Sequence, residues 1–370
     1  MKRNLLLSVA LSIAFLCLQA QTKVGKAHAD PTKSICLSCY HFHPRWTDNY
    51  GDSIEKRYEE FEDVVKAGYF NSIIVEKEYV NDDEFWRIIL ENECTVWLNI
   101  YDSFYSSKSS FEAWVRPFSD ALDVLRKNQE RWDRFLGFHF DEPIWRGQSN
   151  ADFLYETKAL TEMYAKRIYP VFATGEFSGN EGNAMQLEME AEGMRKAIPE
   201  ALAYVTDIGF DAYCMDVRDE YNYGGQKSHL AKVEKEFPGV VDGKTYYSKQ
   251  LEYLVRMVGH DVNVWLYPNA YTTLLWRGGR AGEEYCIAQL REMARIIKEY
   301  PHIGGLALYT YYQFGNPKEL GLQSHLVVTD SKGNQKLRPQ EEKWYDYSRA
   351  LKLMCEEFKS KESNAIGSAR

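Results

Sequence analysis

The feature that most constrains the fold is a regular alternation of short apolar, β-like runs with longer amphipathic stretches, beginning near residue 34. The apolar runs lie at residues 34–41, 71–76, 95–101, 135–141, 168–174, 203–211, 262–267 and 304–311. Helical spacing of apolar residues occurs at 54–67, 82–91, 111–132, 152–166, 185–198, 251–258, 283–300 and 341–358. Such alternation is typical of parallel βαβ units. Eight repeats over roughly 330 residues predict a closed α/β barrel of the (β/α)8 TIM type.

An open, doubly wound sheet is the alternative fold. The dinucleotide site of such sheets needs a G-x-G-x-x-G turn after the first strand, and this chain has none there. No linker interrupts the pattern, so we expect a single barrel domain at residues 30–360. The longest irregular stretch, 214–247, is expected to be either a long loop on the catalytic face or an insertion without a chemical role. The polar residues 361–370 are expected to form a disordered tail.

The N-terminus has the pattern of a secretory signal peptide, residues 1–29. Two basic residues precede an apolar run, 5–18, that is too short to favour a membrane-spanning helix. Cleavage after Ala20 or Ala29 is possible, and Ala29 gives the better match to the small-x-small rule. Cys17 offers lipid anchoring as an alternative, although large residues precede it. We therefore expect a secreted or periplasmic protein with no transmembrane segment after removal of the signal.

Composition narrows the classes of partner. The net charge of −9 disfavours nucleic acid and anionic membranes as partners. The chain has no Walker loop and no G-x-S-x-G turn, and we expect no cofactor.

Cys36 and Cys39 form a C-x-x-C, but their spacing on a strand points them to opposite faces. No second cysteine pair completes a zinc set, so these thiols are expected to be buried.

Carboxylates stand at the ends of several of the predicted strands, where barrel enzymes carry their reacting groups. They are Glu76, Asp141, Glu142, Glu176 and Asp211. Glycoside cleavage needs one carboxylic acid to protonate the leaving oxygen and one carboxylate as nucleophile or base. Crowded carboxylates and partial burial raise the pKa of one of them and keep it protonated. The pattern therefore predicts a glycosidase acting on a poly- or oligosaccharide, with each single carboxylate open to the alternative of a salt bridge or a helix cap.

The fourth run, Gly137-Phe138-His139-Phe140-Asp141-Glu142-Pro143, resembles the strand-end Asp-Glu-Pro of many bacterial TIM-barrel glycoside hydrolases. It is similar also to the Asn-Glu-Pro of the large retaining superfamily of these enzymes. That resemblance implies that Glu142 is the acid/base. The superfamily places its nucleophile at the end of the seventh strand, where this chain has Pro268 and Asn269, so the arrangement with two glutamates is not reproduced.

Two pairings remain open. In one, Asp141 is the nucleophile and Asp211 the acid, which resembles barrel families that cleave α-linked sugars. In the other, Glu142 pairs with Glu176. Alternation along the strand places Asp141 in the barrel mouth if the neighbouring phenylalanines pack outward. Glu142 reaches the mouth only if the strand ends or bulges there, which Pro143 favours. Glu142 and Asp141 are the first candidates, followed by Asp211 and Glu176.

A carbohydrate substrate also needs hydrogen-bonding and stacking groups, and the aromatic content of 14% supplies many of the latter. The residues expected to bind substrate are Glu76, His41, His43, Trp46, Trp145, Asn269, Tyr271, Trp276, Tyr309 and Tyr311. The His41-x-His43 pair resembles the metal site of amidohydrolases, but that family's ligands on later strands are not matched, and no metal is expected. A metal-dependent hydrolase and a non-catalytic carbohydrate-binding barrel remain as alternative functions.

Overall fold

The computed structural model describes the central part of the chain in several pieces. They are residues 36–45, 53–100, 111–143, 150–173, 204–211, 247–248, 251–252, 254–255, 262–268, 272–273, 280–300, 303–309, 311, 319–320, 327–329, 331 and 335–337. The expected signal peptide at 1–29, the expected tail at 361–370 and nearly all of the irregular stretch 214–247 lie outside the described residues. Within the described part of the chain, no helix has the length and apolar character that crossing a membrane requires.

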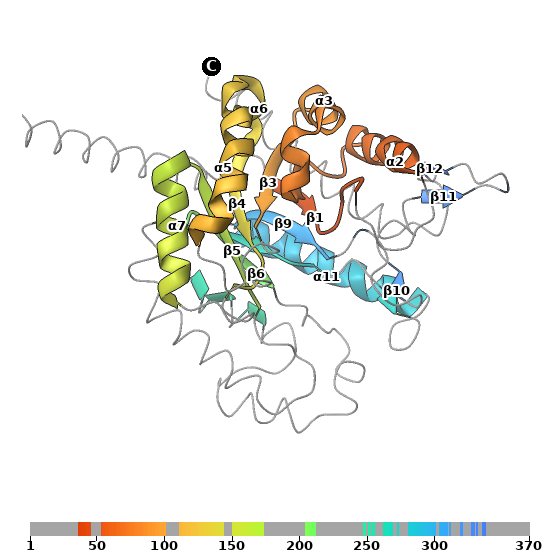
Figure 1. Ribbon diagram of the computed structural model, residues 1–370. Helices are drawn as coiled ribbons and strands as arrows, with labels where there is room; N and C mark the ends of the chain where they lie inside the picture. The colour runs from red at the N-terminus through yellow and green to blue at the C-terminus, as the bar shows by residue number, and fades with distance from the viewer. Residues whose placement is uncertain are drawn as a thin grey trace, which may run out of the picture.

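Eight strands form one parallel sheet, in the order β1-β9-β7-β6-β5-β4-β3-β2 (Figure 1). They are β1 (Cys36–Cys39), β2 (Ser72–Val75), β3 (Thr95–Asn99), β4 (Phe135–Phe140), β5 (Arg167–Ala173), β6 (Asp207–Asp211), β7 (Asn263–Leu266) and β9 (Ile303–Leu308). The two end strands of this order meet through Asn71, which precedes β2. Its backbone N–H donates to the Leu37 carbonyl at 3.0 Å, and its side-chain Oδ1 accepts from the Leu37 N–H at 2.7 Å. The sheet therefore closes, and the predicted (β/α)8 barrel with its eight strand runs is confirmed.

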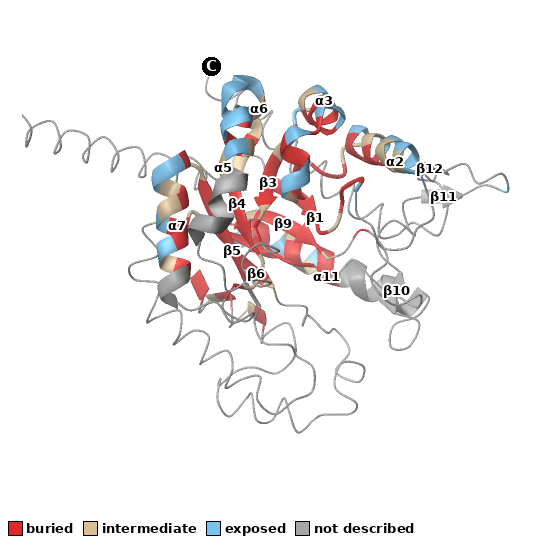
Figure 2. Ribbon diagram, viewed as in Figure 1, coloured by how far each residue is buried: buried red, intermediate tan, exposed pale blue. Residues whose placement is uncertain are grey.

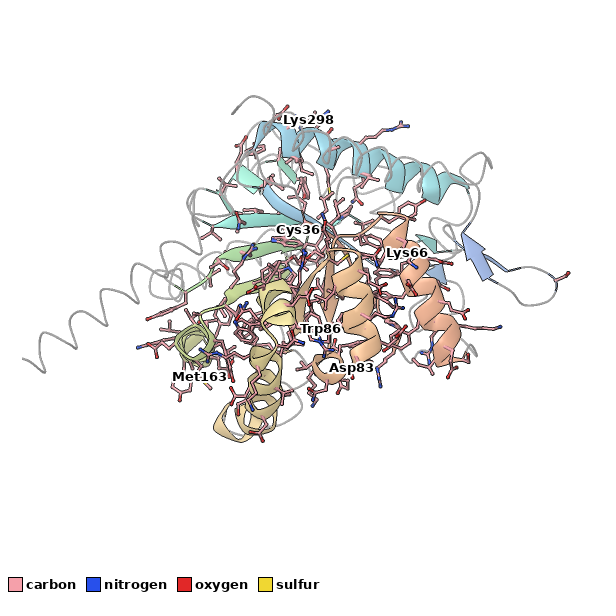
Figure 3. All side chains as sticks on the ribbon, turned by 90° about the horizontal axis from the view of Figure 1, so that it is seen from above. Cys36, Lys66, Asp83, Trp86, Met163 and Lys298 are labelled. Carbon is pink, nitrogen blue, oxygen red and sulfur yellow. The ribbon has the colours of Figure 1, made fainter. Side chains whose placement is uncertain are left out.

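Helices cover the outside of the strands, in agreement with the predicted βα alternation. They are α2 (Ile54–Lys66), α3 (Asp83–Glu91), α5 (Phe111–Lys127), α6 (Gln129–Arg134), α7 (Asn150–Tyr164) and α11 (Arg280–Glu299). Seen from above, α11 with Lys298 runs along one side, α2 with Lys66 and α3 with Trp86 lie on another, and α7 with Met163 occupies a third (Figure 3). Predicted helices at 185–198 and 341–358 lie outside the described residues, and 251–258 is described only in part.

Local capping explains where several helices begin. Ser53 and Asp82 cap α2 and α3, with Asp82 Oδ1 accepting from the Phe85 N–H at 3.0 Å. The single helix predicted at 111–132 is instead two helices, because Asn128 leaves the helical conformation and its side chain caps α6. A short 3-10 helix, η1 (Lys77–Asn81), was not predicted.

Two small antiparallel sheets lie beyond the barrel and were also not predicted. One pairs β8 (Thr272–Thr273) with β10 (Glu319–Leu320), and the other pairs β11 (Val327–Thr329) with β12 (Gln335–Leu337). These strands have two or three residues each, which is too short for an alternation of polar and apolar residues to be recognised.

The interior of the barrel is filled by aromatic rings. Trp97, Tyr169 and Trp265 meet there with ring centroids 4.6–5.7 Å apart. Barrel interiors are more often filled by branched aliphatic residues. Here glycines provide the space, because a Cβ on Gly305 would come within 2.5 Å of the Trp265 ring and one on Gly209 within 2.9 Å of Tyr267. Part of the aromatic content of this chain is therefore structural, and Figure 2 shows the strands themselves as buried.

The amino-terminal end of the barrel is closed by a buried ion pair between Arg167 and Asp207, the first residues of β5 and β6. Arg167 Nε donates to Asp207 Oδ2 at 2.8 Å, and the guanidinium lies over the Trp97 ring, 4.7 Å from its centroid. Asn263 Nδ2 and Trp265 Nε1 also donate to Asp207, at 3.2 and 3.0 Å. The charges of Arg167 and Asp207 are thus paired within the fold.

Successive side chains along each strand point alternately into an inner core, inside the barrel, and an outer core, between the strands and the helices. Cys36 belongs to the inner core of the barrel and Cys39 to the outer core between strands and helices, so their predicted opposite orientation is confirmed. Both thiols are free and buried. On β4, Phe138 and Phe140 pack outward against Tyr164 and Phe153, with ring centroids 5.6 Å apart in each case.

Candidate active site

The outward packing of Phe138 and Phe140 turns the alternate residues of β4 into the barrel, and Asp141 follows them at its carboxyl end. Tyr40, just after β1, donates its hydroxyl hydrogen to Asp141 Oδ1 at 3.1 Å. Asp141 is half-buried. The prediction that Asp141 points into the barrel mouth is confirmed by this contact with a strand on the other side of the barrel.

A series of polar contacts lies below Asp141. His139 is fully buried, with Nε2 2.7 Å from the Tyr40 hydroxyl oxygen and Nδ1 3.3 Å from Asn99 Oδ1. Asn99, at the end of β3, donates from Nδ2 to Glu76 Oε1 at 3.0 Å. Burial lowers the pKa of His139 to about 3, so its ring is neutral near pH 7. His139 is thus a buried core residue with hydrogen-bonding partners at both ring nitrogens.

Three buried phenols line the mouth beside these groups. The Tyr169 and Tyr267 hydroxyls are hydrogen-bonded to each other, and the Tyr40 and Tyr267 rings meet edge to face at 5.6 Å. Burial raises the pKa of Tyr267 well above its usual value, and the charges of Asp211 and Asp141 raise it further. Both carboxylates therefore lie close enough to one phenol to act on it electrostatically.

Asp211 reaches the mouth as the last residue of β6. It is paired with Ala173 at the end of β5, and it shares the inward side of β6 with Asp207 and Gly209. The structure thus places two carboxylates, separated by seventy residues of sequence, at the same end of the barrel. Asp141 and Asp211 are the two predicted catalytic residues whose inward orientation the backbone determines.

Glu142 is held in an uncommon backbone conformation. Its φ of 48° is in the left-handed region, which costs a residue with a Cβ roughly 1–2 kcal/mol. Four described residues other than glycine have this conformation; two, Glu93 and Ala165, follow helices, where such a residue is common. The other two, His41 and Glu142, follow β1 and β4 at the mouth. Strain of this kind clusters at functional sites, and here it ends β4 before Glu142, as Pro143 indicated.

Two further predicted substrate residues lie at the mouth. The rings of His41 and Tyr309 meet edge to face at 5.8 Å, and Tyr309 also lies 6.0 Å from the Tyr40 ring. Both side chains are half-buried. Burial lowers the pKa of His41 to about 4, which leaves a neutral ring able to donate one hydrogen bond and accept another.

His43 and Tyr311 lie elsewhere than expected. His43 is buried behind the strand, with Nδ1 2.8 Å from the Tyr79 hydroxyl of η1. Tyr311 is fully buried between β1 and α2, where its hydroxyl donates to Glu60 Oε1 at 2.9 Å. Both were expected to bind substrate, but the chain turns at His41 and β9 ends before Tyr311, so the alternation of inward and outward side chains does not extend to these two residues. Neither position is open to a substrate, which corrects both expectations.

The remaining predicted site residues lie outside the described residues. They are Glu176, Trp46, Trp145, Asn269, Tyr271 and Trp276. Conversely, Tyr40, Asn99 and Tyr267 were not predicted as site residues from the sequence. Each is the last inward-facing position of its strand or the one just beyond it, so counting alternate positions to the end of every strand would have found them.

In the parts of the chain that the structure describes, no three His, Cys, Asp or Glu side chains gather in a way that would hold a metal ion.

Among known proteins, similarity to this chain was found in solved structures but not in protein families or curated sequences. No protein-family model and no curated protein sequence matches the chain. A thermostable mutant of the xylanase Xyn10A from Cellvibrio japonicus is 11% identical, with 87% of this chain and 97% of that one covered and a TM-score of 0.49. Gas2p from Saccharomyces cerevisiae is 10% identical, with 92% of this chain but only 64% of Gas2p covered and a TM-score of 0.46. The intracellular xylanase TsXylA from Thermoanaerobacterium saccharolyticum is 8% identical, with coverages of 81% and 92% and a TM-score of 0.45. These scores are below 0.5, so the fold rests on the strand order of the chain itself.

Proposed function

We propose that this chain is a glycoside hydrolase acting on a poly- or oligosaccharide, with Asp141 and Asp211 as its pair of carboxyl groups. The observation that carries the proposal is that both residues stand at the carboxyl end of the barrel, Asp141 just after β4 in contact with the Tyr40 hydroxyl and Asp211 as the last residue of β6. Glycoside cleavage needs one group of this pair to protonate the leaving oxygen and the other to attack the sugar or activate water. Half-buried carboxyl groups among phenols are suited to this division, because a low-polarity surrounding favours the protonated form of one of them.

The neighbouring side chains supply the rest of a sugar site. His41 and Tyr309 combine flat rings with polar atoms, which suits the alternating apolar faces and hydroxyl groups of a pyranose. Glu142 stands next to Asp141 as a third carboxylate and as the competing acid/base that the Asp-Glu-Pro resemblance implies. Residues 1–29 are proposed to direct export, which would place the enzyme where polysaccharides are found.

The proposal is tested by incubating the chain lacking residues 1–29 with a panel of poly- and oligosaccharides and measuring released reducing ends. For a cleaved glycan, Asp141→Asn and Asp211→Asn are each expected to lower kcat by roughly three orders of magnitude, because each removes one half of the acid–carboxylate pair. Glu93→Gln, an exposed carboxylate in the turn after α3, serves as the matched control and is expected to retain full activity.

The same panel separates the alternatives. If Glu142→Gln abolishes turnover while Asp211→Asn does not, Glu142 is the acid/base and the proposed pair is wrong. Full activity in both Asp141→Asn and Glu142→Gln would refute the site altogether. A glycan that binds without release of reducing ends would identify the chain as the non-catalytic carbohydrate-binding barrel.

A further inference from the structure

The turn after β1 is anchored on both sides of a strained residue. His41 has a φ of 58°, in the left-handed region, and such strain persists only where the surrounding structure fixes the backbone. Before it, the Tyr40 N–H donates to the Leu308 carbonyl at 2.8 Å, and the Tyr40 carbonyl accepts from the Tyr311 N–H at 2.9 Å. After it, residues 42–45 are held by side chains of the outer core, η1, α2 and the start of α3.

Phe42 makes the first of these later contacts. Its side chain is buried in the outer core, and its ring centroid lies 4.5–4.9 Å from those of Tyr311, Phe61 and Phe70. Phe42 therefore packs away from the mouth, whereas the ring of His41, one residue earlier, lies at the mouth.

The hydroxyl of Tyr79, in η1, makes the second contact. It accepts the backbone N–H of Arg45 and lies 2.8 Å from His43 Nδ1. Tyr79 is itself buried, with its ring centroid 4.9 Å from that of Phe85. One phenol therefore fixes two residues of the turn to the segment that follows β2.

An ion pair completes the anchoring. Asp82, the N-cap of α3, accepts at Oδ2 from Arg45 Nε at 2.9 Å and from Arg45 Nη2 at 2.6 Å, and the Tyr58 hydroxyl of α2 donates to the same oxygen. The Arg45 guanidinium also lies 5.9 Å from the centroid of the Tyr79 ring. Because Asp82 is buried although Arg45 is half exposed, the pair is better shielded from water than one on an open surface.

We propose that Tyr79 and Asp82 are positioning residues for His41, which they hold at the mouth through the turn that follows it. The inference rests on the proposed function in one respect: His41 is then the group that binds a hydroxyl of the sugar. A ring whose place is set before the substrate arrives binds it without the cost of ordering the turn. Neither Tyr79 nor Asp82 needs to touch the substrate for this effect.

The enclosure of His41 gives a readout that needs no substrate. Its ring packs edge to face on Tyr40 and Tyr309, at 5.9 and 5.8 Å, and burial lowers its pKa to about 4. Both neighbouring rings are phenols, which are uncharged near pH 7. The carboxylate of Asp141, which accepts from Tyr40, acts in the opposite direction and favours a charged imidazole. A turn that moves away from these rings should therefore raise the pKa of His41.

The decisive measurement is an NMR titration of the histidine rings between pH 7 and pH 5, with the His41 signal assigned from His41→Asn. Wild-type His41 should remain largely neutral over this range. Tyr79→Phe removes the hydroxyl that fixes the turn, and the His41 midpoint should rise by about one unit or more toward its ordinary value of about 6.5. A wild-type His41 that titrates near 6.5, or a midpoint that Tyr79→Phe leaves unmoved, would overturn the proposal.

Asp82→Asn tests the ion pair separately. Asparagine is as good an N-cap as aspartate, so α3 keeps its first turn while the charge that binds Arg45 is lost. The His41 midpoint should rise as it does in Tyr79→Phe, and an unmoved midpoint would refute the role of Asp82. Tyr164→Phe is the matched control, because it removes a buried hydroxyl that has no hydrogen-bond partner among the described residues. An equal shift in this control would show a general loosening of the fold and contradict the positioning role.

Turnover of a cleaved glycan gives an independent check. Tyr79→Phe should raise KM by about two- to tenfold, as expected for one weakened hydrogen bond, with kcat nearly unchanged. His41→Ala should raise KM at least as much, and adding Tyr79→Phe to it should have no further effect, because the anchor acts through His41. Additive effects of the two changes would contradict the proposal. If no glycan is cleaved, the titration still decides whether Tyr79 and Asp82 hold His41, so the two proposals fail separately.

Discussion

At the scale of single residues, the left-handed backbone positions divide into those that follow helices and those that follow strands. Ala165 and Glu93 follow α7 and α3, where glycine is the usual residue. His41 and Glu142 follow β1 and β4 at the mouth, where no helix end explains them. We therefore propose that the strain at Glu142 directs that carboxylate toward the proposed site.

Glycine substitutions test this division. Ala165→Gly and Glu93→Gly should each raise the free energy of unfolding by about 1 kcal/mol, because glycine adopts positive φ without a Cβ clash. The measurement is urea denaturation, and turnover of a cleaved glycan should not change in either variant. Glu142→Gly should be similarly stabilised and yet lose activity. Unchanged activity in Glu142→Gly would mean that its conformation serves only to end the strand.

The position of a site residue could be predicted where the backbone around it is a regular strand, and could not be predicted where the strand has ended. Asp141 and Asp211 could be placed because they continue an unbroken alternation of inward and outward side chains. His43 and Tyr311 could not, since the chain turns at or before each of them and the alternation stops. The hydrogen-bonded partners of Asp141 were missed because they come from strands distant in sequence, and only the closed barrel brings them together.

At the scale of elements, the strand runs and their closure into a barrel were predicted from the sequence, but the side-chain contact at the seam was not. The strands begin or end within a few residues of the predicted runs, because apolar alternation continues slightly beyond the hydrogen-bonded ladder. The seam between β1 and β2 is made by one backbone and one side-chain hydrogen bond of Asn71. Asn71 substitutes for a strand residue by accepting the Leu37 N–H through its side chain, and an asparagine before a strand carries no sequence signal for that role.

Removing this contact should weaken the seam of the barrel. Asn71→Ala leaves the Leu37 N–H without its acceptor, at an expected cost of about 1–3 kcal/mol in the free energy of unfolding. Asn71→Asp keeps an acceptor oxygen in the same position and is the matched control. Hydrogen exchange of the Leu37 amide, measured in parallel, should accelerate in the alanine variant alone. Equal stability of the two variants would assign the closure to the backbone contacts by themselves.

At the scale of the whole molecule, a barrel filled with aromatic rings must bury polar groups among them. His139 inside the barrel and His43 behind β1 are both fully enclosed, and burial lowers the pKa of each to about 3. An unfolded chain binds protons on these residues near pH 6.5, whereas the folded chain does not. The core of the protein therefore couples its stability to pH, even though neither ring is charged in the folded state.

This coupling predicts a protein that is sensitive to acid. For a histidine with a depressed pKa in the folded state, the stabilisation is fully present above pH 6.5 and is lost as the pH falls toward 3. Between these limits each of the two histidines should contribute a slope of up to about 1.4 kcal/mol per pH unit. Urea denaturation at pH 7, 6, 5 and 4 measures the slope. His43→Gln retains a polar partner for Tyr79 and should reduce the slope by the contribution of one histidine, up to about 1.4 kcal/mol per pH unit. A free energy of unfolding that is independent of pH over this range, or a His43→Gln slope equal to that of the wild type, would show that these rings take up protons within the fold.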